Sequence, residues 1–262
     1  MKKLRKAVLF GCAAAVVLTG AYVWYRAQNQ VTGCREEDFS PWTAVETAHT
    51  IGTGDSQEKR VFLTFDDGPS EMTETVLDIL KEEQVCASFF VIAAEGNEQY
   101  LPLLERTQQE GHTVALHTCS HDYKQIYTST AAFWQDIDAL KEKISPYLTQ
   151  QPTWLRFPGG STNTVSRKYG GSGLMEKLDQ QAAEKGYQVL DWNVSAEDSV
   201  GKNASPEAIL QRIIKDSSGK NTCVVLMHDS KINKTTAQAL PDIIDWYRQQ
   251  GYRFCTLSQD TP

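Results

Sequence analysis

Segments with the pattern of β-strands alternate with segments with the pattern of α-helices through most of this chain of 262 residues. The predicted strands are short runs rich in β-branched and apolar residues, at 61–65, 85–92, 112–117, 153–157, 187–194, 222–228 and 253–257. The predicted helices repeat apolar residues every three or four positions, at 74–84, 131–144, 173–185, 205–215 and 236–249. Because a helix between consecutive strands is the usual connection of a parallel sheet, the alternation predicts an α/β fold with right-handed crossovers.

Seven predicted strands suit either an incomplete (β/α) barrel or an open sheet with helices on both faces. The turn after the first strand, residues 66–71 (DDGPSE), lacks the G-x-G-x-x-G pattern, which counts against a dinucleotide-binding sheet. A barrel carries its functional residues at the carboxyl ends of its strands, and the chain has such residues there. We therefore predict a (β/α)7-like distorted TIM-type barrel.

An apolar run of 19 residues, 7–25, precedes the barrel region. A helix of this length spans roughly 28 Å, close to the ~30 Å hydrocarbon core of a bilayer. The run ends in aromatic residues that favour a membrane interface, and basic side chains are concentrated before it, which predicts a cytoplasmic N-terminus. We predict that residues 1–25 form a basic head and one uncleaved transmembrane helix. A cleaved signal peptide, which would release the protein, is the alternative.

The remainder of the chain divides into a linker and one folded domain. Residues 26–58 are polar and aperiodic, which predicts an extracellular stalk, and residues 59–262 are long enough for one sizeable core. This domain holds four cysteines, for which three disulfide pairings are possible and the sequence favours none. They are Cys86, Cys119, Cys223 and Cys255.

Charge and composition exclude some classes of protein. The proportions of 40% hydrophobic and 23% charged residues are those of a globular protein rather than a disordered or fibrous one. The net charge is −7, and residues 27–262 carry 21 basic against 33 acidic side chains. Because a nucleic-acid binder needs a basic face to neutralise phosphates, no nucleic-acid partner is expected.

Acidic, imidazole and guanidinium side chains follow the ends of five predicted strands, where chance would distribute them over both ends. They are Asp66 and Asp67, His117 and His121, Arg156, Asp191 and Asp198, and His228 and Asp229. Each motif has an ordinary explanation by itself: DDGP is a good turn, an H-x-x-x-H pair can be incidental, and a lone arginine is usually a surface residue. Their joint occurrence favours a catalytic site. Imidazole and carboxylate ligands suit zinc, and a catalytic zinc typically keeps three protein ligands and a water.

Five motifs occur in a fixed order: TFDDGP, H-[ST]-x-x-H, R-x-P-x-G, a Trp/Asp-rich segment within 187–198, and L-x-H. In this the chain resembles the polysaccharide deacetylases of carbohydrate esterase family 4, the NodB-homology domain. The resemblance covers about residues 60–258. The N-terminal anchor and the segment RFPGGSTNT are most similar to the bacterial membrane-anchored peptidoglycan N-acetylglucosamine deacetylases.

The resemblance implies a metal site and a general base. Asp67, His117 and His121 would hold a divalent metal, usually zinc in this family, although another transition metal could replace it. Asp66 would be the general base that takes a proton from the attacking water. Arg156 would hold Asp66 in place and keep it ionised.

The resemblance also implies a general acid and a substrate pocket. His228 would protonate the departing sugar amine, and Asp198 would be its carboxylate partner. A backbone N–H near Pro158 and Gly159 would stabilise the oxyanion, and Leu226 would line the pocket for the acetyl methyl group. The residues assigned to substrate binding are Leu226, Pro158, Gly159 and Trp192.

The chain departs from the family pattern in the groove wall. Ser199 stands where members often have Trp, Ser195 replaces a frequent acid, and Gly159-Gly160 replaces an aromatic residue followed by Gly. None of these changes removes an implied ligand, base or acid. They put the substrate preference in doubt.

The predicted function is metal-dependent hydrolysis of N-acetyl groups from an N-acetylhexosamine glycan, with release of acetate. Peptidoglycan N-acetylglucosamine is the first choice, because an enzyme tethered to the outside of a bacterial membrane meets the cell wall at high effective concentration. The alternatives are a deacetylase of chitooligosaccharide, exopolysaccharide or an O-acetylated glycan, and an inactive wall-glycan-binding pseudoenzyme. The membrane and the wall glycan are the expected partners, and a monomer is assumed.

Overall fold

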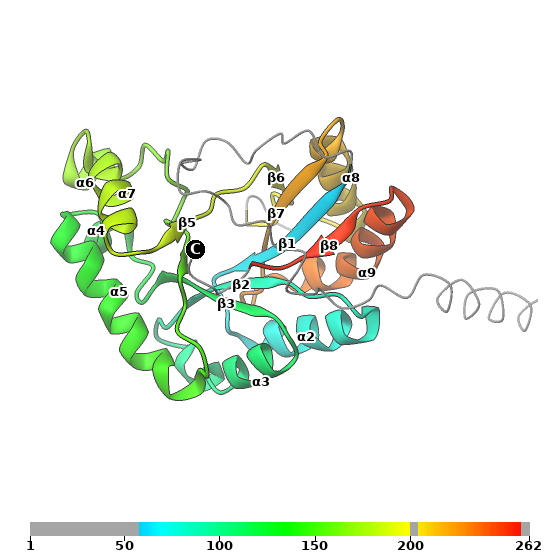
Figure 1. Ribbon diagram of the computed structural model, residues 1–262, viewed down its shortest axis with the longest axis horizontal. Helices are drawn as coiled ribbons and strands as arrows, with labels where there is room; N and C mark the ends of the chain where they lie inside the picture. The colour runs from blue at the N-terminus through cyan, green and yellow to red at the C-terminus, as the bar shows by residue number, and fades with distance from the viewer. Residues whose placement is uncertain (1–57, 200–203, 258–262) are drawn as a thin grey trace, which may run out of the picture. The chain divides into compact units, whose positions relative to one another are not determined.

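The computed structural model describes residues 58–199 and 204–257, whose strands form a single parallel sheet (Figure 1). The order across the sheet is β5-β4-β3-β2-β1-β7-β6, and β8 pairs with the first half of β1. Every pairing is parallel. The strands are β1 Arg60–Asp66, β2 Ser88–Ile92, β3 Thr113–Thr118, β4 Trp154–Leu155, β5 Gln188–Val189, β6 Val194–Ser195, β7 Thr222–His228 and β8 Arg253–Cys255. The sheet curls into a half-barrel, as expected for a distorted (β/α) barrel.

Helices connect the strands and lie outside the curled sheet (Figure 1). The α-helices are α2 Glu71–Glu83, α3 Leu103–Gln109, α4 Tyr123–Ile126, α5 Thr130–Ile144, α6 Arg167–Gly170, α7 Leu174–Glu184, α8 Pro206–Ser217 and α9 Lys234–Gln249, and the 3-10 helices are η2 Glu98–Tyr100 and η3 Ser145–Tyr147. Each predicted helix overlaps one of them. Three helices begin after a serine whose hydroxyl accepts a backbone N–H of the first turn, which is Ser70 for α2, Ser129 for α5 and Ser205 for α8.

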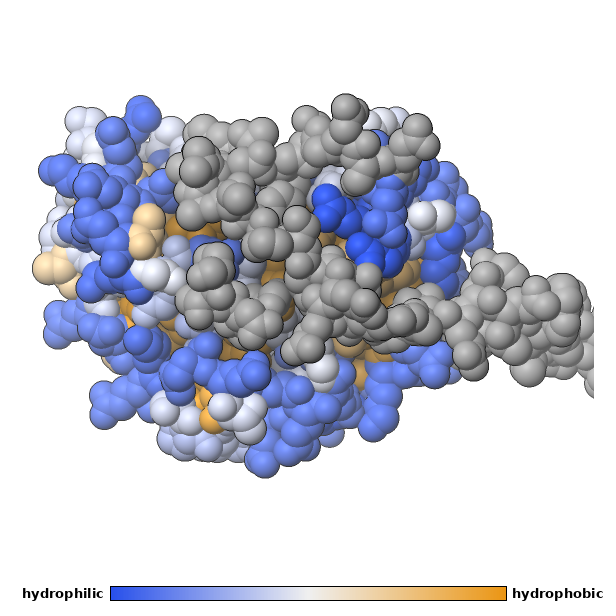
Figure 2. All heavy atoms as spheres, viewed as in Figure 1, coloured by the Kyte–Doolittle hydropathy of each residue, from blue (hydrophilic) through white to orange (hydrophobic). Residues whose placement is uncertain are grey.

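The alternation of side chains along β1 separates the core from the site. Val61, Leu63 and Phe65 belong to the large apolar cluster between the sheet and the helices. Phe62 belongs to a smaller cluster on the other face of the sheet. Because alternate residues of a strand share a face, Thr64 and Asp66 lie on the same face as Phe62. The helices turn mostly hydrophilic side chains outward where described residues are visible (Figure 2).

The prediction of one strand over 187–194 is wrong. The segment forms two short strands at opposite edges of the sheet, β5 against β4 and β6 against β7. Asn193 attaches the start of β6 to β7, because its side-chain Oδ1 accepts the Val224 N–H (2.8 Å), its Nδ2 donates to the Thr222 carbonyl (2.9 Å) and its backbone N–H donates to the Val224 carbonyl (3.2 Å). Residues 190–193 run from one sheet edge to the other.

The predicted basic head, transmembrane helix and stalk lie outside the described residues, so the domain boundaries remain predictions. In the part of the chain that the structure describes, no helix is both long and apolar enough to span a membrane. Cys119 and Cys223 are buried free thiols.

Candidate active site and metal centre

Asp66 and Asp67 lie at the end of β1, where the strand gives way to the turn before α2. Asp66 is the last residue of the strand and is 3% exposed. Asp67 has a φ of 70°, in the left-handed region that aspartate tolerates better than most residues. Because the strand has ended, the two adjacent carboxylates are not forced onto opposite faces of the sheet. Both lie near the imidazole of His117, with its Nε2 3.8 Å from Asp66 Oδ2 and 3.7 Å from Asp67 Oδ1.

Asp67, His117 and His121 form a group that could hold a metal ion. One ligand atom from each lies within 4.8 Å of the other two, and His121 Nε2 is 3.3 Å from Asp67 Oδ1. His117 Nδ1 lies 2.7 Å from the Arg156 carbonyl, so that Nδ1 carries the donated proton and Nε2 keeps its lone pair. Burial lowers the pKa of His117, which also favours the neutral, ligating form.

The donor set fits a divalent cation. Asp67 Oδ1 is buried and accepts no hydrogen bond from any described residue. A buried carboxylate oxygen without a partner is costly, and a cation between it and two neutral imidazoles would offset that cost. Two imidazoles and one carboxylate match the three protein ligands of a catalytic zinc site, whose fourth position is left for water.

Asp66 is held by a fully buried guanidinium. Arg156 is 0% exposed, and its Nη1 donates to Asp66 Oδ1 (2.7 Å) and to Thr64 Oγ1 (2.9 Å). Its Nε donates to the Leu190 carbonyl (2.9 Å), and its guanidinium lies 4.0 Å from the centroid of the Phe90 ring. Arg156 therefore cannot turn away from Asp66 without losing several hydrogen bonds and a cation–π contact.

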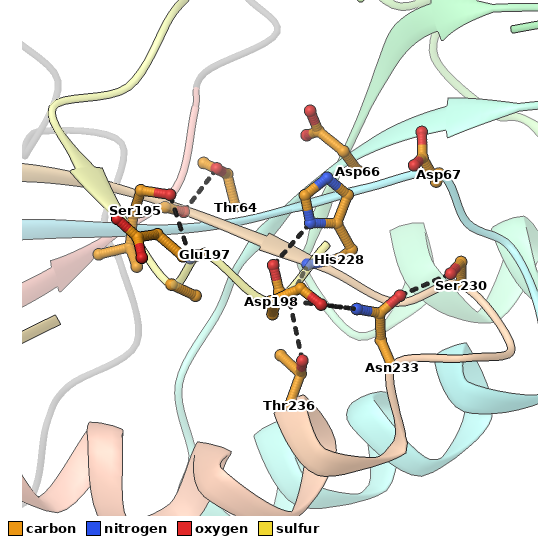
Figure 3. A network of polar contacts seen from close by, with 12 residues as sticks. Thr64, Asp66, Asp67, Ser195, Glu197, Asp198, His228, Ser230, Asn233 and Thr236 are labelled. Atoms are coloured by element: carbon orange, nitrogen blue, oxygen red, sulfur yellow. Dashed lines mark hydrogen bonds and ion pairs between the residues drawn. The ribbon is translucent and has the colours of Figure 1, made fainter. Parts of the chain in front are cut away.

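His228 is held by a second carboxylate on the other side of β1 (Figure 3). Its Nδ1 lies 2.7 Å from Asp198 Oδ1, while Asp198 Oδ2 accepts the His228 backbone N–H (2.9 Å) and the Thr236 hydroxyl (2.8 Å). Burial acts to lower the pKa of His228, but the hydrogen bond and charge of Asp198, together with the charges of Asp66 and Asp67, raise it to about 9. The imidazole can therefore hold a proton at neutral pH.

Comparison with known proteins identifies the family. The family model for polysaccharide deacetylase matches residues 53–172. A peptidoglycan-N-acetylglucosamine deacetylase of Bacillus cereus is 30% identical over 206 residues, which are 78% of this chain and 89% of that protein. The catalytic domain of a peptidoglycan N-acetylglucosamine deacetylase from Eubacterium rectale is 38% identical, with a TM-score of 0.74 over 82% of this chain and 96% of that one. This chain belongs to the polysaccharide deacetylase family.

A further solved relative agrees with this assignment. The carbohydrate esterase family 4 enzyme of Streptococcus mutans is 31% identical, with a TM-score of 0.67 over 77% of this chain and 87% of that one. The chain is therefore a hydrolase of the deacetylase type, and the family resemblance predicted from the motifs is confirmed.

The predicted pocket residues of the deacetylase lie around the same strand ends. Leu226 is two residues before His228 on β7 and so shares its face of the sheet. Gly159 and Gly160 both have positive φ, 78° and 83°, in the loop after β4. A Cβ on Gly160 would lie 3.3 Å from the Trp192 ring, which places Trp192 against this loop. Pro158 accepts the Tyr127 hydroxyl at its carbonyl (2.7 Å).

Some residues that support the site have no recognisable signal in the sequence. Asp136 on α5 accepts the Cys119 N–H (2.6 Å) and the Ser120 N–H (3.1 Å), and so holds the loop between the two metal-site histidines. Nothing in its helical pattern separates it from a solvent-exposed acid. The sequence likewise gives no signal that Asn233 and Thr236 donate hydrogen bonds to Asp198.

Asp229 follows His228 and anchors the turn that carries Asp67. Its carbonyl accepts the Ser70 hydroxyl (2.6 Å), its carboxylate accepts the Thr73 hydroxyl (2.5 Å), and a Cβ on Gly68 would lie 2.2 Å from its Oδ2. Only glycine fits at residue 68. Burial raises the pKa of Asp229 to about 7. The sequence predicts the position of Asp229 at a strand end, but not its hydrogen bonds with Ser70 and Thr73.

Proposed function

We propose that this protein is a metal-dependent deacetylase of peptidoglycan N-acetylglucosamine, which hydrolyses the acetamide to acetate and a free amine. The observation that carries the proposal is the buried, unpaired Oδ1 of Asp67 facing the imidazoles of His117 and His121. Beside it lie the buried pairs Asp66–Arg156 and His228–Asp198. Relatives named as peptidoglycan N-acetylglucosamine deacetylases support the choice of substrate.

The side chains divide the reaction into two proton transfers. A bound divalent ion, for which zinc suits the donor set best, would polarise the acetyl carbonyl and make the attacking water more acidic. Asp66 accepts the proton of that water as its oxygen attacks the acetyl carbon, while Arg156 fixes the carboxylate. His228 then donates its Nε2 proton to the sugar nitrogen as the C–N bond breaks, while Asp198 holds Nδ1–H. Acetate and an amine leave, and the proton from Asp66 passes to solvent.

The location of the reaction is part of the same proposal. The apolar run at 7–25 and the basic side chains before it support a single-pass anchor with the enzyme outside the cell membrane. A tethered enzyme would meet the wall glycan at high effective concentration. Each acetyl group removed leaves an amine that is cationic near neutral pH, which alters the charge of the wall.

Acetate release by the purified full-length chain tests the proposal. The protein is stripped with a chelator, reloaded with zinc, and incubated with purified peptidoglycan or with N-acetylglucosamine oligomers. We expect zinc-dependent release of acetate and an equal yield of new amines from peptidoglycan. A chelator-treated protein as active as the zinc-loaded one would contradict the metal dependence. Zinc-dependent activity on the oligomers alone would make a chitooligosaccharide the substrate, and zinc binding without acetate release would favour the pseudoenzyme.

A further inference from the structure

Tyr123, the first residue of α4, lies next to the metal-site histidine His121. Its ring is edge-to-face with the His121 ring (5.6 Å between centroids) and with the Tyr127 ring (5.5 Å). Asp122 caps this helix by accepting the Lys124 N–H (2.9 Å). The Tyr123 ring is therefore fixed on one side by the metal site and on the other by the buried Tyr127.

The Tyr123 hydroxyl reaches the loop after β4. A Cβ on Gly159 would lie 3.1 Å from Tyr123 Oη, so the phenol occupies the space into which a side chain at 159 would point.

This hydroxyl has no hydrogen-bond partner among the described residues, although it is half-buried. The Tyr127 hydroxyl, by contrast, donates to the Pro158 carbonyl. Buried tyrosine hydroxyls usually find a partner, so an unpaired one beside a catalytic site is available to a ligand.

A second unpaired donor lies next to it. The N–H of Gly160 donates to the Phe157 carbonyl (2.8 Å), and the N–H of Ser161 donates to Asp191 (3.0 Å). The N–H of Gly159 has no acceptor among the described residues, and Gly159 is exposed. The Tyr123 hydroxyl and the Gly159 N–H, neither with an acceptor among the described residues, therefore both belong to the contact between α4 and the loop after β4.

We propose that Tyr123 is a further catalytic residue, whose hydroxyl donates a hydrogen bond to the acetyl oxygen as that oxygen becomes the oxyanion of the tetrahedral intermediate. This inference rests on the proposed deacetylase function. The phenol keeps its proton throughout and acts only as a hydrogen-bond donor. Asp66 and Asp67 are only acceptors when ionised and cannot take this role. A side chain at residue 159 would crowd the Tyr123 hydroxyl, so the absence of one at Gly159 leaves room for the hydroxyl to reach the acetyl oxygen.

Tyr123→Phe in the full-length chain tests the role, because phenylalanine keeps the ring contacts and removes only the donor. We expect kcat for acetate release from purified peptidoglycan to fall about 10²–10³-fold, the usual cost of one oxyanion donor, with KM little changed. The zinc content should equal that of the wild type. A phosphonate analogue of the tetrahedral intermediate should bind the variant more weakly by a similar factor, whereas acetylated glycan should bind both equally. Tyr147→Phe, on the 3-10 helix after α5, is the matched control and should behave as the wild type.

Each other outcome overturns the inference in a recognisable way. An unchanged kcat in Tyr123→Phe, beside an active wild type, would overturn the role of Tyr123 alone. A loss confined to KM would mean that the phenol binds the sugar, and a loss of zinc would mean that the ring only supports His121. A wild type that releases no acetate from any glycan would overturn the proposed function and this inference with it.

Discussion

The site contains two buried pairs, Asp66–Arg156 and His228–Asp198, whose partner residues Arg156 and Asp198 come from opposite sides of β1 in the sheet. The partners carry opposite charges. Asp66 is a carboxylate fixed by an arginine that is always charged, and that arginine is completely buried. His228 is an imidazole fixed by a carboxylate, and its charge depends on pH. In the proposed mechanism the first pair supplies the proton acceptor and the second supplies the proton donor. The comparison predicts that damage to each pair has a different signature in metal content, leaving group and pH.

Removing a metal ligand should produce the largest loss of activity, because neither pair can act without the ion. His117→Ala or His121→Ala leaves two ligands, which hold a catalytic ion poorly, so we expect both zinc content and acetate release to fall to background. Metal analysis and acetate assays on the full-length chain measure this. His112→Ala removes a histidine outside the metal cluster and should keep its zinc. A His117→Ala protein with normal zinc content would contradict the assignment of the cluster.

The adjacent aspartates should separate by metal content. Asp66→Asn should keep zinc and lose about 10²–10⁴-fold in kcat, the usual contribution of a general base, whereas Asp67→Asn should lose zinc because a neutral amide is a weak ligand. The reverse pattern, an empty Asp66→Asn site and a slow but zinc-loaded Asp67→Asn, would mean that the two roles are exchanged.

His228→Ala should also keep its zinc, and its loss should depend on the leaving group. An amine must be protonated to leave, whereas the phenoxide of an activated acetate ester leaves with less help. We therefore expect a loss of about 10²–10⁴-fold on the acetamide and a smaller loss on 4-nitrophenyl acetate. Asp66→Asn, which impairs the attack common to both substrates, is the comparison. Equal losses on the two substrates in His228→Ala would argue against its role as the acid.

The strand-end residues of the site could be predicted from the sequence, because strand patterns locate Asp66, His117, Arg156 and His228 and parallel strands end at one edge. The family motifs then supplied their roles. The supporting residues could not be predicted. Asp136 lies on a helix where its pattern matches that of any exposed acid, and its contact with the Cys119 and Ser120 amides depends on how α5 packs against β3. Similarly, the segment at 187–194 has the composition of a strand, and only the pairing of its two halves with β4 and β7 in the folded sheet reveals the break.

The pH dependence should distinguish the two pairs further. Against the lowering effect of burial, the hydrogen bond and charge of Asp198, with the charges of Asp66 and Asp67, raise the pKa of His228 to about 9, so a donor role predicts that activity falls as pH rises through about 9. In Asp198→Asn the pKa should move toward the ordinary value near 6.5, and the alkaline fall should begin at a lower pH. The same sign applies to stability: because the pKa is raised on folding, this contribution is fully present below about pH 6.5 and is lost as pH rises through about 9. Rate–pH profiles and denaturant unfolding across pH 6–10 measure the two effects, and an unshifted alkaline limb in Asp198→Asn would contradict the pairing.

The smallest effect should come from trimming the support of Asp198 while leaving both pairs in place. Thr236 is fully buried and donates its hydroxyl to Asp198 Oδ2 (2.8 Å), which also accepts the His228 N–H. Thr236→Val keeps the shape but removes this donor, and a hydrogen bond to a charged group contributes about 1.5–3 kcal/mol to stability. We expect the free energy of unfolding to fall by about that amount and kcat to fall only a few-fold, because the His228 backbone N–H, the His228 Nδ1–H and the Asn233 side-chain amide still donate to the carboxylate. Thr235→Val, one residue earlier on α9 and away from Asp198, is the control and should change neither quantity. If Thr236→Val were to cost as much activity as Asp198→Asn, the hydroxyl would be acting on the imidazole's proton rather than on the position of its partner.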